Sequence, residues 1–297
     1  MKQELLEGEP LTKKYENLGF TAQRMVHPPG KCFGLLVGMP GSGKSHFIQS
    51  NEGAFIINCD GTSTTNDNPE ACIWPGVNEK GMPIDVGNKE IALDWDLILK
   101  KKEQLIELAK NQQPRPETVV MDSLIPAIGL VKNYVTKQSG RQNWKELDGR
   151  RAWDDVYEFL LQYALELRKY GYGFYFICHL VNSKIPLGDD KYVIRPELTI
   201  TDSFYKRLFP LFELVVAFES AYVNETREIT MKGPQGKAGP KKLVTEKVHK
   251  YQMKINDEAL SGITKCRVRL PDTLDIPQED SWEWFETEYN KALERAT

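Results

Sequence analysis

The chain has 297 residues, of which 40% are hydrophobic and 27% are charged, and its formal net charge is −3. This composition is ordinary for a globular protein, and the length fits one large α/β domain with additions. Because the net charge is small, it does not by itself indicate a nucleic-acid partner. No run approaches about 18 apolar residues and the N-terminus lacks the apolar stretch of a signal peptide, so we expect no membrane span and no export. The five cysteines form no C-x-x-C pair, which predicts reduced thiols, a cytoplasmic protein and no structural zinc site.

A glycine-rich segment follows the first apolar run of the chain. Residues 1–30 are polar and predict an N-terminal arm, and 33–37 are predicted to form the first buried strand. The letters GMPGSGKS at 38–45 then match the G-x-x-x-x-G-K-[ST] pattern without a mismatch. A helix-forming segment comes next, so the context is the strand, loop and helix of a P-loop. The alternative is a glycine-rich turn with a chance Lys-Ser pair.

Each position of this loop has a physical role. Gly41 and Gly43 can adopt positive φ, so that consecutive N–H groups point at a bound phosphate. Lys44 would reach the β- and γ-phosphates, and the Ser45 hydroxyl would ligate Mg²⁺. The predicted nucleotide-binding residues are Gly38, Pro40, Gly41, Ser42, Gly43, Lys44, Ser45 and His46.

Apolar strands and amphipathic helices alternate through the next part of the chain. We predict strands at 54–60, 118–122, 173–178 and 212–218. We predict helices at 89–110, 124–138 and 153–167. A long loop with a short hairpin is predicted at 61–87, and a mobile loop at 183–196. This alternation predicts a mostly parallel sheet that helices cover on both faces.

The C-terminal part follows a different pattern. Alternating, turn-broken segments after Tyr222 predict β-hairpins, a further strand is expected at 265–270, and a helix at 281–295. The predicted organisation is therefore an N-terminal arm at 1–30, an ATPase core at 31–221, a basic hairpin-rich extension at 222–271 and a C-terminal helix at 272–297.

Four further features have two interpretations each. Residues 231–254 carry seven lysines against one glutamate, and this run and the loop at 183–196 either contact nucleic-acid phosphates or are solvated faces. Trp144, which has arginines nearby, either stacks a base or packs in the protein. The alternating basic residues of the last strand point to one side and either supply a basic finger to a neighbouring subunit or form an exposed face. These residues are Lys265, Arg267 and Arg269.

Four chemically active residues stand at or just beyond predicted strand or loop ends: Lys44, Asp60, Asp122 and His179. Ligands of parallel sheets bind at the carboxyl ends of the strands, so we expect these residues to meet. Asp122 ends an h-h-h-D strand and either supports Mg²⁺ or caps the next turn. Asp60 either positions the attacking water or belongs to an Asp-Gly turn. His179 either senses the γ-phosphate or is a satisfied histidine at a strand end.

The order of motifs resembles the RecA-like ATPases of bacteriophages, the phage nucleotide-binding AAA-type proteins associated with single-strand annealing and recombination. The motifs are GMPGSGKS, INCDG ending at Gly61, VVMDS ending at Ser123, FICH ending at His179, and RVRLP ending at Pro271. They extend over about 31–271. In relatives a glutamate commonly follows the second strand, where this chain has Asp60.

The resemblance implies a RecA-type core that hydrolyses ATP with Mg²⁺ at subunit interfaces. It also implies a homo-oligomer, either a hexamer ring or a filament, that binds single-stranded DNA through mobile loops. Two other classes remain: a nucleotide or small-molecule kinase, which should show an arginine-rich lid, and an ATP-binding switch or packaging partner without DNA-stimulated turnover.

Overall fold

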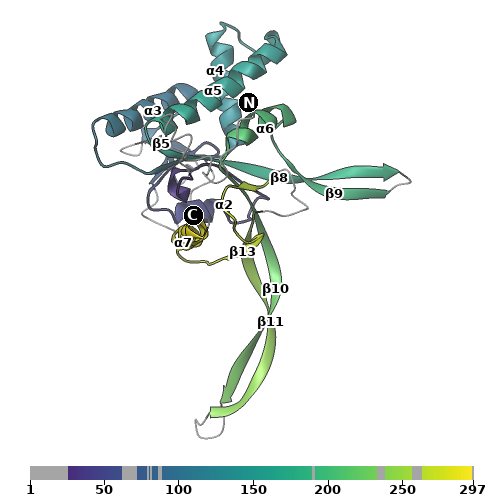
Figure 1. Ribbon diagram of the computed structural model, residues 1–297. Coiled ribbons are helices and arrows are strands. Elements are labelled where there is room, and N and C mark those ends of the chain that lie inside the picture. Colours follow the sequence, from purple (N-terminus) through teal and green to yellow (C-terminus); the bar gives the residue numbers. More distant parts are fainter. Residues whose placement is uncertain are drawn as a thin grey trace, which may run out of the picture.

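The computed structural model describes residues 26–61, 72–78, 80, 82–85, 89–188, 191–232, 238–255 and 263–295. Most of the predicted N-terminal arm, 1–25, lies outside these residues. A large sheet forms the centre of the molecule, and two β-hairpins project from it in different directions (Figure 1).

The large sheet has the order β13-β11-β10-β1-β8-β7-β2-β3. Strands β10, β1, β8, β7, β2 and β3 run parallel, whereas β11, β12, β13 and β9 pair antiparallel to their neighbours. The core strands are β1 (Phe33–Gly38), β2 (Ala54–Asn58), β3 (Cys72–Trp74) and β7 (Thr118–Asp122). The others are β8 (Gly173–Gly188), β9 (Lys191–Leu198), β10 (Leu214–Lys232), β11 (Ala238–Lys254), β12 (Lys265–Cys266) and β13 (Thr273–Ile276). Every residue of β1, β2 and β7 is buried, because helices cover both faces.

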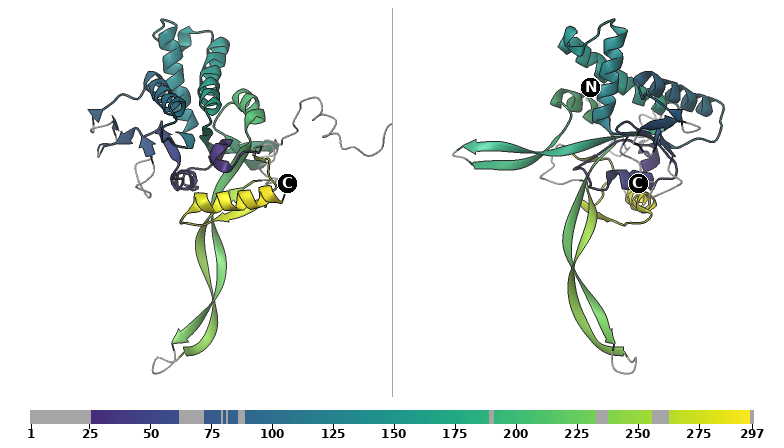
Figure 2. Two further views of the ribbon diagram at one scale, coloured as in Figure 1. Left: turned by 60° about the vertical axis from the view of Figure 1, so that its left-hand side comes forward. Right: turned by 180° about the vertical axis from the view of Figure 1, so that it is seen from behind.

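Each face of the sheet has its own hydrophobic core. One face packs against α3 (Trp95–Lys110), α4 (Leu124–Gln138), α5 (Gly149–Lys169) and α6 (Asp202–Leu208). The other face packs against α2 (Lys44–Gln49) and α7 (Ser281–Glu294). Figure 2 shows α7 below the sheet, on the side away from α3, α4 and α5. The 3₁₀ turns are η1 (Pro29–Lys31), η2 (Trp144–Glu146) and η3 (Phe209–Leu211). The predicted α/β fold with a mostly parallel, helix-covered sheet is confirmed.

Of the two projecting hairpins, one was predicted and one was not: hairpins were expected after Tyr222, as the structure has them, but a loop was expected at 183–196. The loop predicted at 183–196 is wrong: β8 continues to Gly188 and pairs with β9, from Leu180 opposite Leu198 to Gly188 opposite Lys191. We call this hairpin the short arm. The strand predicted to end at 218 also continues, because β10 extends to Lys232 and pairs with β11; we call the hairpin beyond Phe218 the long arm. Both faces of a two-stranded ribbon meet solvent, so neither arm needs the apolar face that would identify a strand.

Smaller differences have local causes. The helix predicted from 89 begins at Trp95, because the Asp94 carboxylate caps it by accepting a hydrogen bond from Leu97 N at 2.9 Å. Within the described part of 61–87 the predicted short hairpin is present as part of a small antiparallel sheet, and β3, which was not predicted, joins the main sheet. The strands of the small sheet are β4 (Gly76–Val77), β5 (Pro83–Asp85) and β6 (Lys89–Glu90). The strand predicted at 265–270 is limited to β12.

Candidate nucleotide-binding site

The loop between β1 and α2 has the backbone of a phosphate-binding loop. Gly41 has φ 75° and Gly43 has φ 93°, both in the left-handed region that favours glycine. Gly43 is the N-cap of α2, so the free N–H groups of the first helical turn lie next to the loop. A tight turn, in which Ser42 N donates to Met39 O at 3.1 Å, fixes the middle of the loop.

Lys44 lies over this loop with its side chain buried. Its Nζ donates to Gly38 O at 2.9 Å and to Met39 O at 2.8 Å, and it also donates to Ser42 Oγ at 3.3 Å. Burial lowers the pKa of Lys44 from 10.5 to about 8, and the nearby Asp122 carboxylate opposes that decrease. The loop thus accepts hydrogen bonds from the buried ammonium group, and a bound anion would have to replace some of them.

Ser45 of α2 and Asp122 of β7 lie within hydrogen-bonding distance of each other. The Ser45 hydroxyl donates to Asp122 Oδ2 at 3.1 Å, although the two residues belong to different elements. A hydroxyl and a carboxylate at this separation are the hard oxygen ligands that Mg²⁺ prefers. Within the described part of the chain there is no cluster of three or more His, Cys, Asp or Glu residues that could hold a metal alone. A Mg²⁺ ion here would take its remaining ligands from phosphate and water.

His179 lies beside the start of the loop. It is opposite Gly38 in the pairing of β8 with β1, which places it one strand away from the loop. Burial and then the charge of Lys44 lower the pKa of His179, whereas Asp60 raises it, so these three side chains share one neighbourhood. The His179 Nδ1 atom is buried and has no hydrogen-bond partner among the described residues.

The sheet order explains how the predicted residues come together. Strand β8 lies between β1 and β7, and β2 lies beyond β7, so His179, Asp122 and Asp60 follow one another along the carboxyl edge. Asp60 stands two residues beyond the end of β2. The backbone also links these strand ends, because Cys59 N donates to Asp122 O at 2.5 Å. The structure thus brings Lys44, Ser45, Asp60, Asp122 and His179 to one place.

The basic residues predicted on the last strand lie elsewhere. β12 pairs with the beginning of β10, at the opposite edge of the sheet from the loop. Lys265 Nζ donates to Phe209 O and Pro210 O at 3.2 Å each, and Arg267 Nη1 is 3.9 Å from Glu213 Oε1. The strand ends at Cys266. The prediction that Lys265, Arg267 and Arg269 point to one side of a strand therefore does not hold. A role toward a neighbouring subunit stays a prediction.

Trp144 packs within the protein. Its ring makes an edge contact with Trp153 at 5.5 Å between centroids, and Lys132 Nζ lies 4.7 Å from its centroid. Lys132 Nζ also lies 4.9 Å from the Trp153 centroid. These contacts favour the packing interpretation of Trp144 over base stacking.

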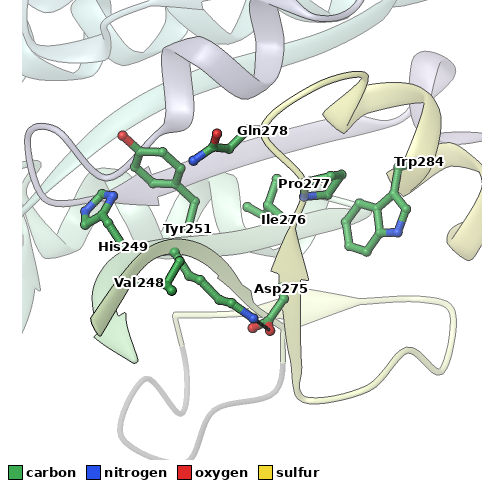
Figure 3. Close-up of a pocket in the computed structure, with 9 residues that line it drawn as sticks. Val248, His249, Tyr251, Asp275, Ile276, Pro277, Gln278 and Trp284 are labelled. Atoms are coloured by element: carbon green, nitrogen blue, oxygen red, sulfur yellow. Dashed lines mark hydrogen bonds and ion pairs between the residues drawn. The ribbon is translucent and has the colours of Figure 1, made fainter. Parts of the chain in front are cut away.

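One part of the site was not predicted: a pocket of about 340 Å³ beside the loop (Figure 3). Its lining includes His249 and Tyr251 from β11 and Gln278 from the segment before α7. The Tyr251 ring lies against the loop, since a Cβ placed on Gly43 would be 2.8 Å from Tyr251 Cδ1. Gln278 O is 2.8 Å from His46 Nε2, next to the predicted metal ligand Ser45. These residues are some 200 positions from the P-loop in sequence, and no motif marks them.

These features define an α/β P-loop nucleoside triphosphatase fold. A family model described as an AAA domain matches residues 31–254, so the chain belongs to this AAA domain family. Among solved structures, a KaiC-like protein from the hyperthermophilic archaeon Pyrococcus horikoshii OT3 is similar over 84% of this chain and 91% of its own, with 12% identity and a TM-score of 0.32. No curated protein matches the chain. None of the described helices is both long and apolar enough to cross a bilayer.

Proposed function

We propose that the protein is a Mg²⁺-dependent ATPase that acts on single-stranded DNA as a homo-oligomer, in phage recombination, annealing or replication. The main support for ATPase activity is that Lys44 and the Ser45–Asp122 pair lie together at the phosphate-binding loop. Membership in the AAA domain family supports the same activity.

Each side chain has a role in this proposal. Lys44 exchanges its loop carbonyl partners for the β- and γ-phosphates, and its positive charge stabilises the negative charge of the transferring group. Bound Mg²⁺ would neutralise phosphate charge between Ser45 and Asp122. Asp60 orients the attacking water, and His179 donates a hydrogen bond to the terminal phosphate. The lowered pKa keeps His179 neutral near pH 7, so one ring nitrogen donates and the other accepts.

The two arms support a role on DNA. The short arm is the direct continuation of β8 beyond His179, and Thr199, just after β9, donates to His179 O from its N at 3.1 Å and from its Oγ1 at 3.0 Å. A shift of His179 on phosphate release would therefore reach this arm through its own backbone. On the long arm, Lys241, Lys242 and Lys247 are exposed, as phosphate-binding lysines must be.

The deciding experiment measures ATP hydrolysis by the purified protein with and without single-stranded DNA. Lys44→Ala serves as the blank, because it removes the ammonium group and leaves the sheet intact. We expect DNA to stimulate wild-type hydrolysis and to have no effect on the variant. Hydrolysis that is indifferent to DNA would contradict the DNA role, and transfer of phosphate to an acceptor in a substrate screen would establish a kinase instead.

The oligomer is tested separately by light scattering after gel filtration, with and without ATP and Mg²⁺. A ring or filament predicts a mass several times 34.0 kDa. A monomer under every condition would remove the shared-interface part of the proposal and favour the switch hypothesis.

A further inference from the structure

The direction of a bound nucleotide follows from the order of the strands. The predicted metal ligand Asp122 and the predicted γ-phosphate sensor His179 stand on β7 and β8, which lie on one side of β1. Strands β10 and β11 lie on the other side. A triphosphate that extends along the loop with its terminal phosphate toward His179 would place its nucleoside toward β10 and β11.

The pocket beside the loop lies at that position. Phe218 of β10 is opposite Gly38, the last residue of β1, and Ser220 is opposite Tyr251. Tyr251 therefore lies beside the loop that follows β1 and not beside β1 itself, and its ring contacts Gly43. The hydrogen-bonding contact between His46 and Gln278 O holds the other wall against α2.

We infer that this pocket binds the base of an adenine nucleotide, with the base stacked on the Tyr251 ring and its edge facing the Gln278 amide. The inference rests on the proposed function, whose phosphate site it extends to the nucleoside. Aromatic rings stabilise bases by stacking, and an amide offers both a donor and an acceptor, the pattern that the edge of adenine presents. Figure 3 shows the Gln278 side chain next to the Tyr251 ring.

Contacts around the pocket hold it in a binding-ready shape. The His249 ring meets the Tyr251 ring edge-to-face at 5.0 Å and 87°. Tyr222, from the opposite strand, contacts His249 at 5.1 Å. Asp275 accepts hydrogen bonds from Lys250 Nζ at 3.1 Å and from Gln252 Nε2 at 2.8 Å, which joins β11 to β13 at one side of the pocket. A site that is already formed loses little free energy to ordering when a ligand binds.

The test separates the base from the phosphates. We would measure the affinities of Mg-ATP and of inorganic tripolyphosphate by isothermal titration calorimetry for the wild type, Tyr251→Ala and Tyr251→Phe. Leu243→Ala is the control, because Leu243 belongs to the same strand β11 but is 70% exposed and outside the pocket. We expect Tyr251→Ala to weaken ATP by about 10- to 100-fold and tripolyphosphate by less than about twofold. Tyr251→Phe and Leu243→Ala should match the wild type.

Each other result overturns the inference. Equal affinities of Tyr251→Ala and wild type for ATP would show that the base does not use this ring, while the proposed ATPase would stand. Loss of both ligands in Tyr251→Ala would show that Tyr251 acts on the loop through Gly43 instead. Failure of the folded wild type to bind either ligand would overturn the proposed function as well. Circular dichroism spectra that match the wild type establish that each variant is folded.

Discussion

Replacing Lys44 by methionine should make the nucleotide-free protein more stable while it abolishes nucleotide binding. A pKa lowered from 10.5 to about 8 means that the fold disfavours the charged amine. Each pKa unit corresponds to about 1.4 kcal/mol, so the charge costs about 3 kcal/mol below pH 8. Methionine fills a similar volume without a charge, but it leaves the hydrogen bonds to Gly38 O and Met39 O unmade. If these cost about 1 to 2 kcal/mol, the net gain for Lys44→Met is about 1 to 2 kcal/mol.

The sign of the pH dependence makes this prediction specific. Between pH 8 and pH 10.5 the unfolded chain holds a proton on Lys44 that the folded chain has lost, so wild-type stability rises with pH in this window. The variant lacks this contribution, and its advantage should shrink as the pH rises through the window. Urea unfolding of both proteins at about pH 7 and about pH 10 measures the difference. A variant that is less stable at about pH 7, or an advantage that does not change with pH, would refute the reasoning.

The remaining predictions concern the other elements of the site. Asp122→Asn should reduce hydrolysis by about 100-fold and weaken the dependence on Mg²⁺, measured as phosphate release across a magnesium titration; unchanged turnover would remove Asp122 from the metal site. His179→Ala should preserve ATP affinity but abolish stimulation by single-stranded DNA, measured by comparing nucleotide titrations with DNA-dependent rates, and retained stimulation would contradict the sensor role. Replacing Lys241, Lys242 and Lys247 together by glutamine should reduce the salt dependence of DNA binding, by about one in the slope of log K against log salt for each lost phosphate contact. Lys100→Gln on α3 is the control, and an equal loss there would indicate a general charge effect.

The core and the phosphate-binding loop were predictable because their signals are local. A buried parallel strand is apolar throughout, as in β1 and β7, and the glycines of the loop follow from the positive φ that the backbone needs at Gly41 and Gly43. The convergence of Asp122 and His179 was also predictable, because the carboxyl ends of parallel strands share one edge.

The alternation after Tyr222 predicted a hairpin there, but the short arm, the length of the long arm and the pocket had no comparable signal. Tyr251 reaches the loop only because β11 folds back beside β10, and that pairing depends on a long hairpin whose strands carry no apolar face. The same lack of pattern made 183–196 resemble a loop, although the register between β8 and β9 is continuous from Leu180 to Pro186 of β8. The pairing of two solvated strands depends on the turn between them and on the strand that leads into the turn. Neither feature indicates where the hairpin ends.

The length of the long arm restricts how copies of this chain can assemble. From Phe218 to Lys232, at about 3.3 Å per residue, the ribbon extends about 45 Å from the edge of the loop. A compact chain of this length has a radius of gyration of about 19 Å, so the arm spans roughly the width of a whole subunit. In a ring or a filament, an arm of this length could reach across the adjacent copy. Its base lies where Ser220 pairs with Tyr251, so a contact made along the arm would act on the same strand that lines the pocket beside the loop.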